Sequence, residues 1–185
     1  LHDLSDSDPP EHLDYDFWLG PAPMRPYNPN RSHYHWRYYW DYGSGDIGTI
    51  GVHWIDTALW LLDIGWPSAV ISSAGKFVLT DSRETPDTQM AIYEYPDFFM
   101  TFELRQWSNF QNMGRLMGTA IFGENQTLII DRNGWQVYDQ DGTTLLIDEK
   151  PVGDLLQDHV DDFLDAVENR TQPSAPISSG QISSA

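Results

Sequence analysis

The chain has 185 residues, with 10 Lys and Arg against 28 Asp and Glu, a formal net charge of −18 at pH 7. This balance argues against nucleic acids and anionic membranes as partners, because both require a basic surface. Hydrophobic residues make up 40% and aromatic residues 14% of the sequence, which predicts a folded domain and not a disordered acidic tail. Cysteine is absent, so disulfides and thiolate chemistry are excluded.

The longest apolar stretches are shorter than the ~20 residues that span a bilayer. The first residues, which begin with Leu1, contain no basic segment followed by an apolar one, so no secretory signal is recognised. We therefore expect a soluble protein, with the cytoplasm favoured as its location.

The first 44 residues predict an extended lead-in that is rich in aromatic residues and proline. Residues 1–16 contain six acidic residues and no Lys or Arg. Four prolines between residues 21 and 29 disfavour a helix, and eight Trp and Tyr residues crowd the segment 18–42.

The rest of the chain predicts two helices separated by strands. Apolar residues at Val52, Ile55, Leu59 and Leu62 give residues 52–62 one buried helical face. Alternating β-branched and aromatic runs then predict strands at 69–71, 76–79, 89–95, 98–104, 118–122, 127–131, 135–138 and 143–147. Residues 154–170 predict a second helix with an apolar stripe and an acidic face, and the Pro- and Ser-rich residues 171–185 predict loop or linker.

This order of elements predicts an α+β fold, with an open, largely antiparallel β-sheet and helices packed on one face. The sequence shows no alternation of strands with helices, no P-loop, and no G-x-G-x-x-G after a strand. A nucleotide-binding half is therefore not recognised in the chain.

The best candidate for chemistry is the segment from Asp46 to Asp56. On a helix, His53 and Asp56 are three residues apart and can touch, and a His oriented by a carboxylate is a common general acid or base. Thr49 lies four residues before His53, and would share its face. The alternative is that His53 and Asp56 form a structural pair, and the pattern alone favours that interpretation.

A second candidate lies between Arg31 and Tyr42. Aromatic rings beside charged groups suit sugars, whose CH faces stack on rings while their hydroxyls pair with polar groups. Packing of a loop-rich segment explains many of these rings equally well, and His33 with His35 is too small a set to indicate a metal site. The candidate substrate-binding residues are Arg31, His35, Trp36, Arg37, Tyr42, Asp46 and Thr49.

Several blocks of the sequence resemble the C-terminal domain of bacterial Gfo/Idh/MocA oxidoreductases. The resemblance covers nearly all of the chain. Its blocks are Trp18-Leu19-Gly20-Pro21-Ala22-Pro23, Arg25-Pro26-Tyr27-Asn28-Pro29-Asn30-Arg31, Trp40-Asp41-Tyr42-Gly43, Gly45-Asp46-Ile47-Gly48, Gly51-Val52-His53-Trp54-Ile55-Asp56, Glu84-Thr85-Pro86-Asp87-Thr88-Gln89, Phe122-Gly123, His159 to Val167, and Ser178 to Ser184.

The resemblance implies that full-length members join an N-terminal Rossmann domain, which binds NAD(P), to this α+β domain. It implies a sugar pocket, and an open sheet that builds a homo-oligomer. The family's acid/base His falls on His53, and its usual Asp or Asn partner falls on Thr49. The expected parts are therefore the lead-in 1–44, a substrate and dimerisation domain at 45–170, and the tail 171–185.

Three functions follow as hypotheses. The first is a carbohydrate-binding and oligomerisation domain that needs a separate nucleotide-binding half for hydride transfer, with no cofactor in this chain. The second is a cofactor-free glycoside hydrolase or lyase with His53 as acid/base and Asp56 beside it. The third is a pure interaction module that self-associates through exposed apolar surface.

Overall fold

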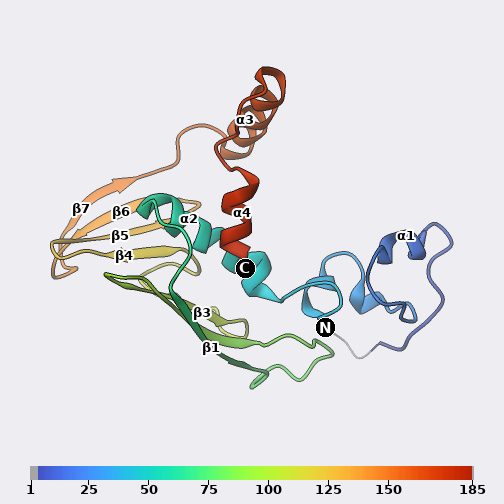
Figure 1. Ribbon diagram of the computed structural model, residues 1–185. Coiled ribbons are helices and arrows are strands. Elements are labelled where there is room, and N and C mark those ends of the chain that lie inside the picture. The colour runs from blue at the N-terminus through green and yellow to red at the C-terminus, as the bar shows by residue number, and fades with distance from the viewer. Residues whose placement is uncertain (1–3, 185) are drawn as a thin grey trace. The chain divides into compact units, whose positions relative to one another are not determined.

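The computed structural model describes residues 4–184 (Figure 1). The chain forms two compact units. The first unit comprises the chain up to Val52 together with Pro67–Ser108. The second comprises His53–Trp66 and the chain from Asn109 onward. The two units are described separately below.

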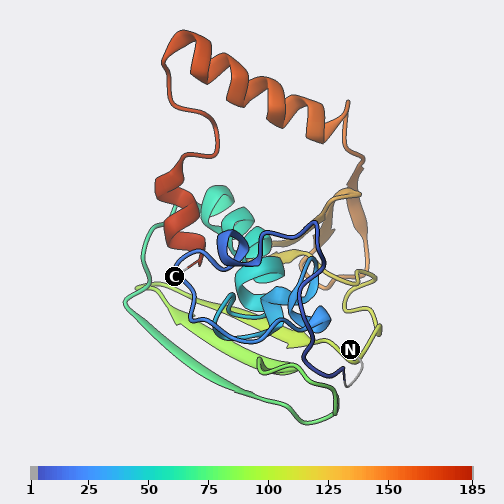
Figure 2. The same ribbon diagram turned by 90° about the vertical axis from the view of Figure 1, so that its right-hand side faces the viewer.

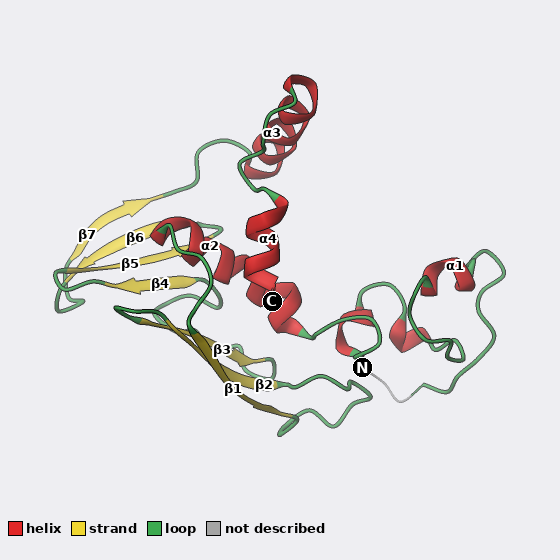
Figure 3. Ribbon diagram, viewed as in Figure 1, coloured by secondary structure: helices red, strands yellow, loops and turns green. Residues whose placement is uncertain are grey.

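The lead-in is mostly irregular, but it contains short helices where only extended chain was expected (Figure 3). These are α1 (Tyr15–Leu19) and the 3-10 turns η1 (Pro29–Arg31) and η2 (His35–Tyr38). The Asp14 carboxylate caps α1 by accepting a hydrogen bond of 3.0 Å from the backbone N–H of Phe17. The helices are short because proline recurs between them, as the composition indicated.

The sheet of the first unit has three antiparallel strands in the order β1-β2-β3. Their bounds are β1 (Ala69–Gly75), β2 (Thr88–Glu94) and β3 (Phe99–Arg105). Ile71 pairs with Ile92, and Ile92 pairs with Thr101. The strands expected at 89–95 and 98–104 are therefore confirmed, and the first strand is longer than expected.

The strand expected at 76–79 was wrong, and Asp87 explains why. The buried Asp87 carboxylate accepts hydrogen bonds from the backbone N–H groups of Phe77, Val78 and Leu79, at 3.1, 2.9 and 2.6 Å. These donors would otherwise pair with a neighbouring strand. Residues 76–87 consequently form a pinned loop between β1 and β2.

The second unit contains a four-stranded antiparallel sheet in the order β4-β5-β6-β7. Its strands are β4 (Thr119–Phe122), β5 (Gln126–Asp131), β6 (Gly134–Asp139) and β7 (Leu145–Glu149). Helix α2 (Val52–Leu62) is joined to β4 by the hydroxyl of Thr119, which donates to the carbonyl of Trp54 at 2.9 Å. The helix buries Ile55, Ala58 and Leu59, the spacing that the sequence predicted for its inner face.

Two further helices end the chain. Helix α3 (Leu155–Asn169) extends away from the β4–β7 sheet (Figure 2). The apolar stripe of α3, which includes Leu156 and Phe163, is exposed. Helix α4 (Ile177–Ser184) occupies the tail that was expected to be loop or linker, so that prediction was wrong. No helix among residues 4–184 is long and apolar enough to cross a membrane.

The α+β class and the open antiparallel architecture are confirmed. The expected sheet is present as two sheets, one in each unit. Residue patterns do not separate the two sheets, because both consist of hairpins with the same alternation of residues.

Replacing Asp87 with Asn tests whether this carboxylate holds the 76–87 loop. Burial alone would raise the pKa of Asp87, but hydrogen bonds from the backbone and from the Thr88 hydroxyl hold its pKa at about 2. We expect Asp87→Asn to lower the free energy of unfolding by about 1–3 kcal/mol in urea titrations at pH 7, because one carboxylate oxygen becomes an NH2 group, which cannot accept from the N–H donors that faced it.

The same carboxylate predicts a dependence on pH. Because the folded pKa of Asp87 is depressed, its stabilisation is present above pH 4 and is lost as pH falls towards 2. Asp97→Asn, on the exposed turn between β2 and β3, serves as the control. An Asp87→Asn protein with wild-type stability at pH 7 would contradict the assignment.

Candidate functional site

The segment that leads to His53 forms a π-helical turn, η3 (Ile47–Gly51), which runs directly into α2. Glycine at position 51 permits this turn to approach β3, since a Cβ there would lie 2.9 Å from the ring of Phe102. Turns of this kind insert one extra residue into a helix and recur at functional sites. The sequence predicted the glycines but not the π-helical geometry.

His53 lies in the first turn of α2, and its side chain is exposed. Its backbone carbonyl accepts a hydrogen bond of 2.8 Å from the hydroxyl of Thr57. Within residues 4–184 the imidazole forms no hydrogen bond or ion pair, and the contact expected with Asp56 is not formed. The proposed catalytic pair is therefore an exposed His beside an independent carboxylate.

Thr49 uses its hydroxyl on the backbone. The hydroxyl donates to the carbonyl of Gly45 at 3.1 Å, a local bond typical of Thr within a helical turn. The π-helical turn also removes the regular α-helical spacing on which the expected pairing of Thr49 with His53 depended. Thr49 therefore stabilises the turn.

Asp46 belongs to a polar network that the sequence did not reveal. Its carboxylate accepts a hydrogen bond from the side-chain amide of Gln106, whose oxygen in turn accepts one from Arg83. Arg83 also forms two hydrogen bonds of 2.7 Å with Asp81, and its guanidinium lies 4.7 Å from the ring centre of Tyr38. Residues from three separate parts of the first unit are joined by this network.

The network fixes the charges of its members. Burial opposes the charge of Arg83, but the hydrogen bonds and the charge of Asp81 raise the pKa of Arg83 above its ordinary value. The hydrogen bonds from Arg83 likewise lower the pKa of Asp81. Both side chains are at least 87% buried, so the ion pair is largely shielded from water, and the mutual hydrogen bonds keep both groups charged despite this burial.

The candidates between residues 31 and 37 occupy different environments. Arg31 is buried and binds Asp6 and the carbonyl of Pro26, so its guanidinium anchors the lead-in. Arg37 lies 3.6 Å from the ring centre of Tyr34. His35 stacks on the ring of Tyr38, and burial lowers the pKa of His35 below its ordinary value.

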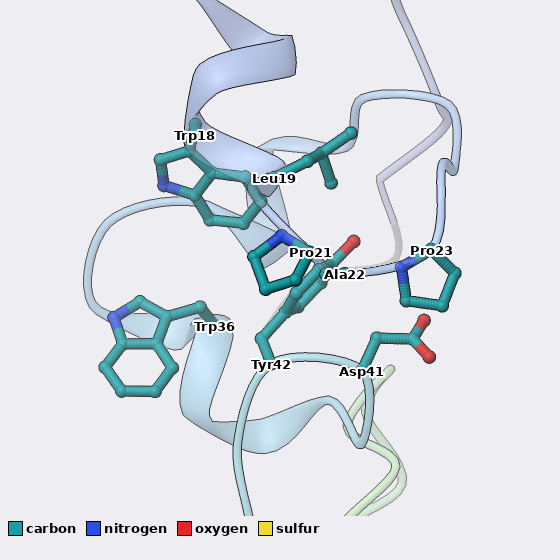
Figure 4. Close-up of a pocket in the computed structure, with 8 residues that line it drawn as sticks. All are labelled: Trp18, Leu19, Pro21, Ala22, Pro23, Trp36, Asp41 and Tyr42. Atoms are coloured by element: carbon teal, nitrogen blue, oxygen red, sulfur yellow. The ribbon is translucent and has the colours of Figure 1, made fainter.

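Trp36 and Tyr42 line a pocket of about 500 Å³ in the first unit (Figure 4). Figure 4 shows the indoles of Trp18 and Trp36 on one side of Tyr42, with Asp41 on the other side next to Pro23. Leu19, Pro21 and Ala22 complete the lining. The sequence predicted Trp36 and Tyr42 as ligand contacts but not Trp18 or Asp41, although both lie in blocks that carried the family resemblance.

Residues 43–48 spell G-x-G-x-x-G, so we tested whether they could hold a dinucleotide. A Cβ at Gly43 would lie 2.9 Å from the Cα of Arg37, and one at Gly45 would lie 2.9 Å from the Cβ of Thr85. The chain's own atoms therefore fill the space beside these glycines, and no strand precedes them in the described part of the chain. The segment does not fit the pyrophosphate of NAD(P). No cluster of three metal-ligating side chains occurs in the described part of the chain.

Comparison with known protein families identifies the family of the chain. Residues 1–98 match the Gfo/Idh/MocA family described as "Oxidoreductase family, C-terminal alpha/beta domain". The chain belongs to this family. The resemblance recognised in the sequence is thereby confirmed.

Solved structures with the same fold are dehydrogenases and oxidoreductases. UDP-N-acetylglucosamine 3-dehydrogenase GnnA from Acidithiobacillus ferrooxidans has a TM-score of 0.58 at 14% identity, over 91% of this chain and 53% of that one. The WlbA dehydrogenase from Bordetella pertussis, solved with NADH and UDP-GlcNAcA, has a TM-score of 0.51 at 17% identity, over 81% and 42%. An Agrobacterium radiobacter oxidoreductase solved with NAD+, L-tartaric acid and magnesium has a TM-score of 0.54 at 11% identity, over 84% and 48%.

These identities show the fold alone. The chain spans about half of each of these structures or less. No curated protein matches the chain by sequence.

Substituting Gly43 tests how the turn that carries Trp36 is held. A Cβ at this position would meet the backbone of Arg37 and lie 3.2 Å from the indole of Trp36. We expect Gly43→Ala to lower the free energy of unfolding by about 1–3 kcal/mol, because this backbone neighbour cannot move aside. Gly65→Ala is the control, since nothing lies within 4 Å of its Cβ. Equal stabilities of the two variants in urea titrations would show that the turn is not packed as described.

Proposed function

We propose that the chain is the substrate-binding half of an oxidoreductase that acts on a sugar or sugar derivative. The observation that carries this proposal is the exposed His53 at the start of α2, whose imidazole has no partner within residues 4–184 and which lies in the Gly-Val-His-x-x-Asp block of a family member. An exposed imidazole can receive a proton from a substrate hydroxyl or return one to it. The names of GnnA, a UDP-N-acetylglucosamine 3-dehydrogenase, and of WlbA, solved with UDP-GlcNAcA, support a sugar derivative as the substrate class.

Hydride transfer requires a complex of this chain with a nicotinamide-binding half. The chain's own glycine-rich segment does not fit the cofactor, as its packing shows. His53 is the acid/base, and Asp56 lies three residues later on the same helix, with no hydrogen bond from its carboxylate to another described residue. Asp46, through Gln106 and Arg83, holds the turn before the helix, and Thr49 supports the same turn.

The alternative of a cofactor-free glycoside hydrolase or lyase receives no support from the comparisons, whose reported matches are dehydrogenases and oxidoreductases. The structure also lacks the expected contact between His53 and Asp56 among the described residues. We therefore do not carry this alternative further.

The role of His53 can be tested in a protein that carries this domain together with its nicotinamide-binding half. We expect His53→Ala to lower kcat for sugar oxidation by about 10²- to 10⁴-fold, the usual contribution of a general acid or base. His159→Ala, on the exposed surface of α3, is the control and should keep wild-type kcat. Nicotinamide absorbance measures both. The 185-residue chain alone should reduce no NAD(P)+, and steady reduction by it would overturn the proposal.

We also propose that the open face of the β1–β3 sheet joins two copies of the chain. Cross-strand pairing places Ile71, Met90 and Phe99 on this face, with exposed fractions of 59%, 43% and 69%. Glu94 and the Glu103–Arg105 ion pair share this face, and exposed apolar side chains bordered by polar ones indicate an interaction site. The pairing of like faces gives a symmetric dimer, which is the commonest closed assembly.

Charge reversal tests the dimer. Ile71→Glu should convert a dimer to a monomer in light scattering, because two buried carboxylates would face each other. Val152→Glu, at an exposed residue outside the sheet, should leave the mass unchanged. A wild-type protein that is monomeric at 100 μM would contradict the proposal.

A further inference from the structure

Helix α3 carries an apolar stripe that the described part of the chain leaves largely uncovered. Its apolar residues recur at i, i+4, i+7, i+8 and i+11, a spacing that places them on one side of a helix. Their exposed fractions lie between 40% and 71%, and Ala166 alone is buried among the 15 residues of the helix. An apolar stripe of this length is normally packed, so α3 presents an interaction surface. The stripe residues are Leu156, Val160, Phe163, Leu164 and Val167.

The helix itself is fixed by hydrogen bonds that do not involve the stripe side chains. The Asp154 carboxylate caps its first turn by accepting from the backbone N–H groups of Leu156 and Gln157, at 3.0 and 3.2 Å. The Asp162 carboxylate accepts from the backbone N–H and the hydroxyl of Ser174, at 2.9 and 2.7 Å, and so fastens the following segment to the helix. A partner therefore meets a preformed helix, which lowers the entropic cost of binding.

The polar side of α3 is acidic. The helix contains five acidic residues and no Lys or Arg, the acids being Asp158, Asp161, Asp162, Asp165 and Glu168. Asp161 lies three residues before Leu164 and Glu168 lies four residues after it, so both adjoin the stripe on this edge. The surface is therefore apolar along its length and negative along its border.

This distribution of charge disfavours two occupants. A second copy of α3 would bring five further acids to the same contact, in a chain whose net charge is already −18, and like charges that face each other across an interface weaken binding. Helices that lie in a membrane surface carry Lys and Arg on their polar side, which α3 lacks. A helix with Lys or Arg beside an apolar stripe matches both features of α3.

We propose that α3 binds a basic amphipathic helix of another polypeptide. The apolar side of that helix packs on the stripe, and its Lys or Arg side chains pair with Asp161 and Glu168. Burial of the stripe supplies most of the affinity, and the ion pairs at its border select a basic partner. This proposal goes beyond the proposed oxidoreductase function and does not depend on it.

The test uses the full 185-residue chain and a fluorescein-labelled peptide with Leu at i, i+3, i+4 and i+7 and Lys at the other positions. We expect saturable binding in fluorescence anisotropy, weakened by added salt. Phe163→Glu should weaken binding about ten-fold or more, because it places a carboxylate in the stripe, whereas a merely nonspecific attraction would increase with the added negative charge. Phe17→Glu makes the same change at an exposed residue of α1 and should bind as wild type does.

A second variant and further probes complete the test. Val167→Glu, four residues along the stripe, should repeat the loss. Equal binding by both variants with wild-type circular dichroism spectra would overturn the proposal.

Comparisons on the wild-type protein do not depend on how any variant folds. Equal binding of a peptide with the same composition in scrambled order, or of one with Glu in place of Lys, would contradict the proposal. Co-sedimentation of the chain with phosphatidylcholine vesicles would assign the stripe to a membrane, and a mass in light scattering that falls on Phe163→Glu would assign it to a second copy. Either result would also overturn the proposal.

Discussion

The first unit depends on the buried carboxylate of Asp87. By accepting three successive backbone N–H groups it bends the chain after β1 into a loop and prevents residues 77–79 from pairing as a strand. Lys76 completes the loop by donating to the carbonyls of Asp81 and Arg83. The loop residues that contact the aromatic segment are positioned by these hydrogen bonds to Asp87 and from Lys76.

The loop then positions the aromatic segment. The backbone N–H groups of Glu84 and Thr85 both donate to the carbonyl of Tyr38, and the Glu84 carboxylate accepts from the N–H of Trp40. Glu84 also shares Arg25 with Asp41, which lines the pocket. A carboxylate between two strands is thus linked, through backbone hydrogen bonds and one arginine, to the wall of the aromatic pocket.

The sequence predicted what depends on local pattern and missed what depends on distant contacts. Helix α2 and strands β2 and β3 were predicted because apolar periodicity survives in them. The segment 76–79 has the composition of a strand, and only the presence of Asp87 ten residues later decides otherwise. Helix α4 was missed because Pro and Ser at 173–176 indicate a loop, although Pro176 immediately precedes the helix, where its restricted backbone is tolerated.

The candidate site divides in the same way. Trp36 and Tyr42, which line the pocket, were expected as ligand contacts from residue type, and His53 was expected as an acid/base from a motif, since these signals lie in neighbouring residues. Arg83 and Gln106 were missed because they reach Asp46 only after the chain has folded, over 60 residues in the case of Gln106. Arg31 was expected to contact a ligand, but its side chain is buried and pairs with Asp6, so it stabilises the fold of the lead-in.

The π-helical turn before α2 has an evolutionary consequence. Such a turn differs from an α-helix by a single inserted residue, so deletion of one residue from Ile47–Gly51 would rotate every later side chain of the helix by about 100° about its axis. The direction in which His53 faces can therefore change by one insertion or deletion, without any substitution in the helix itself.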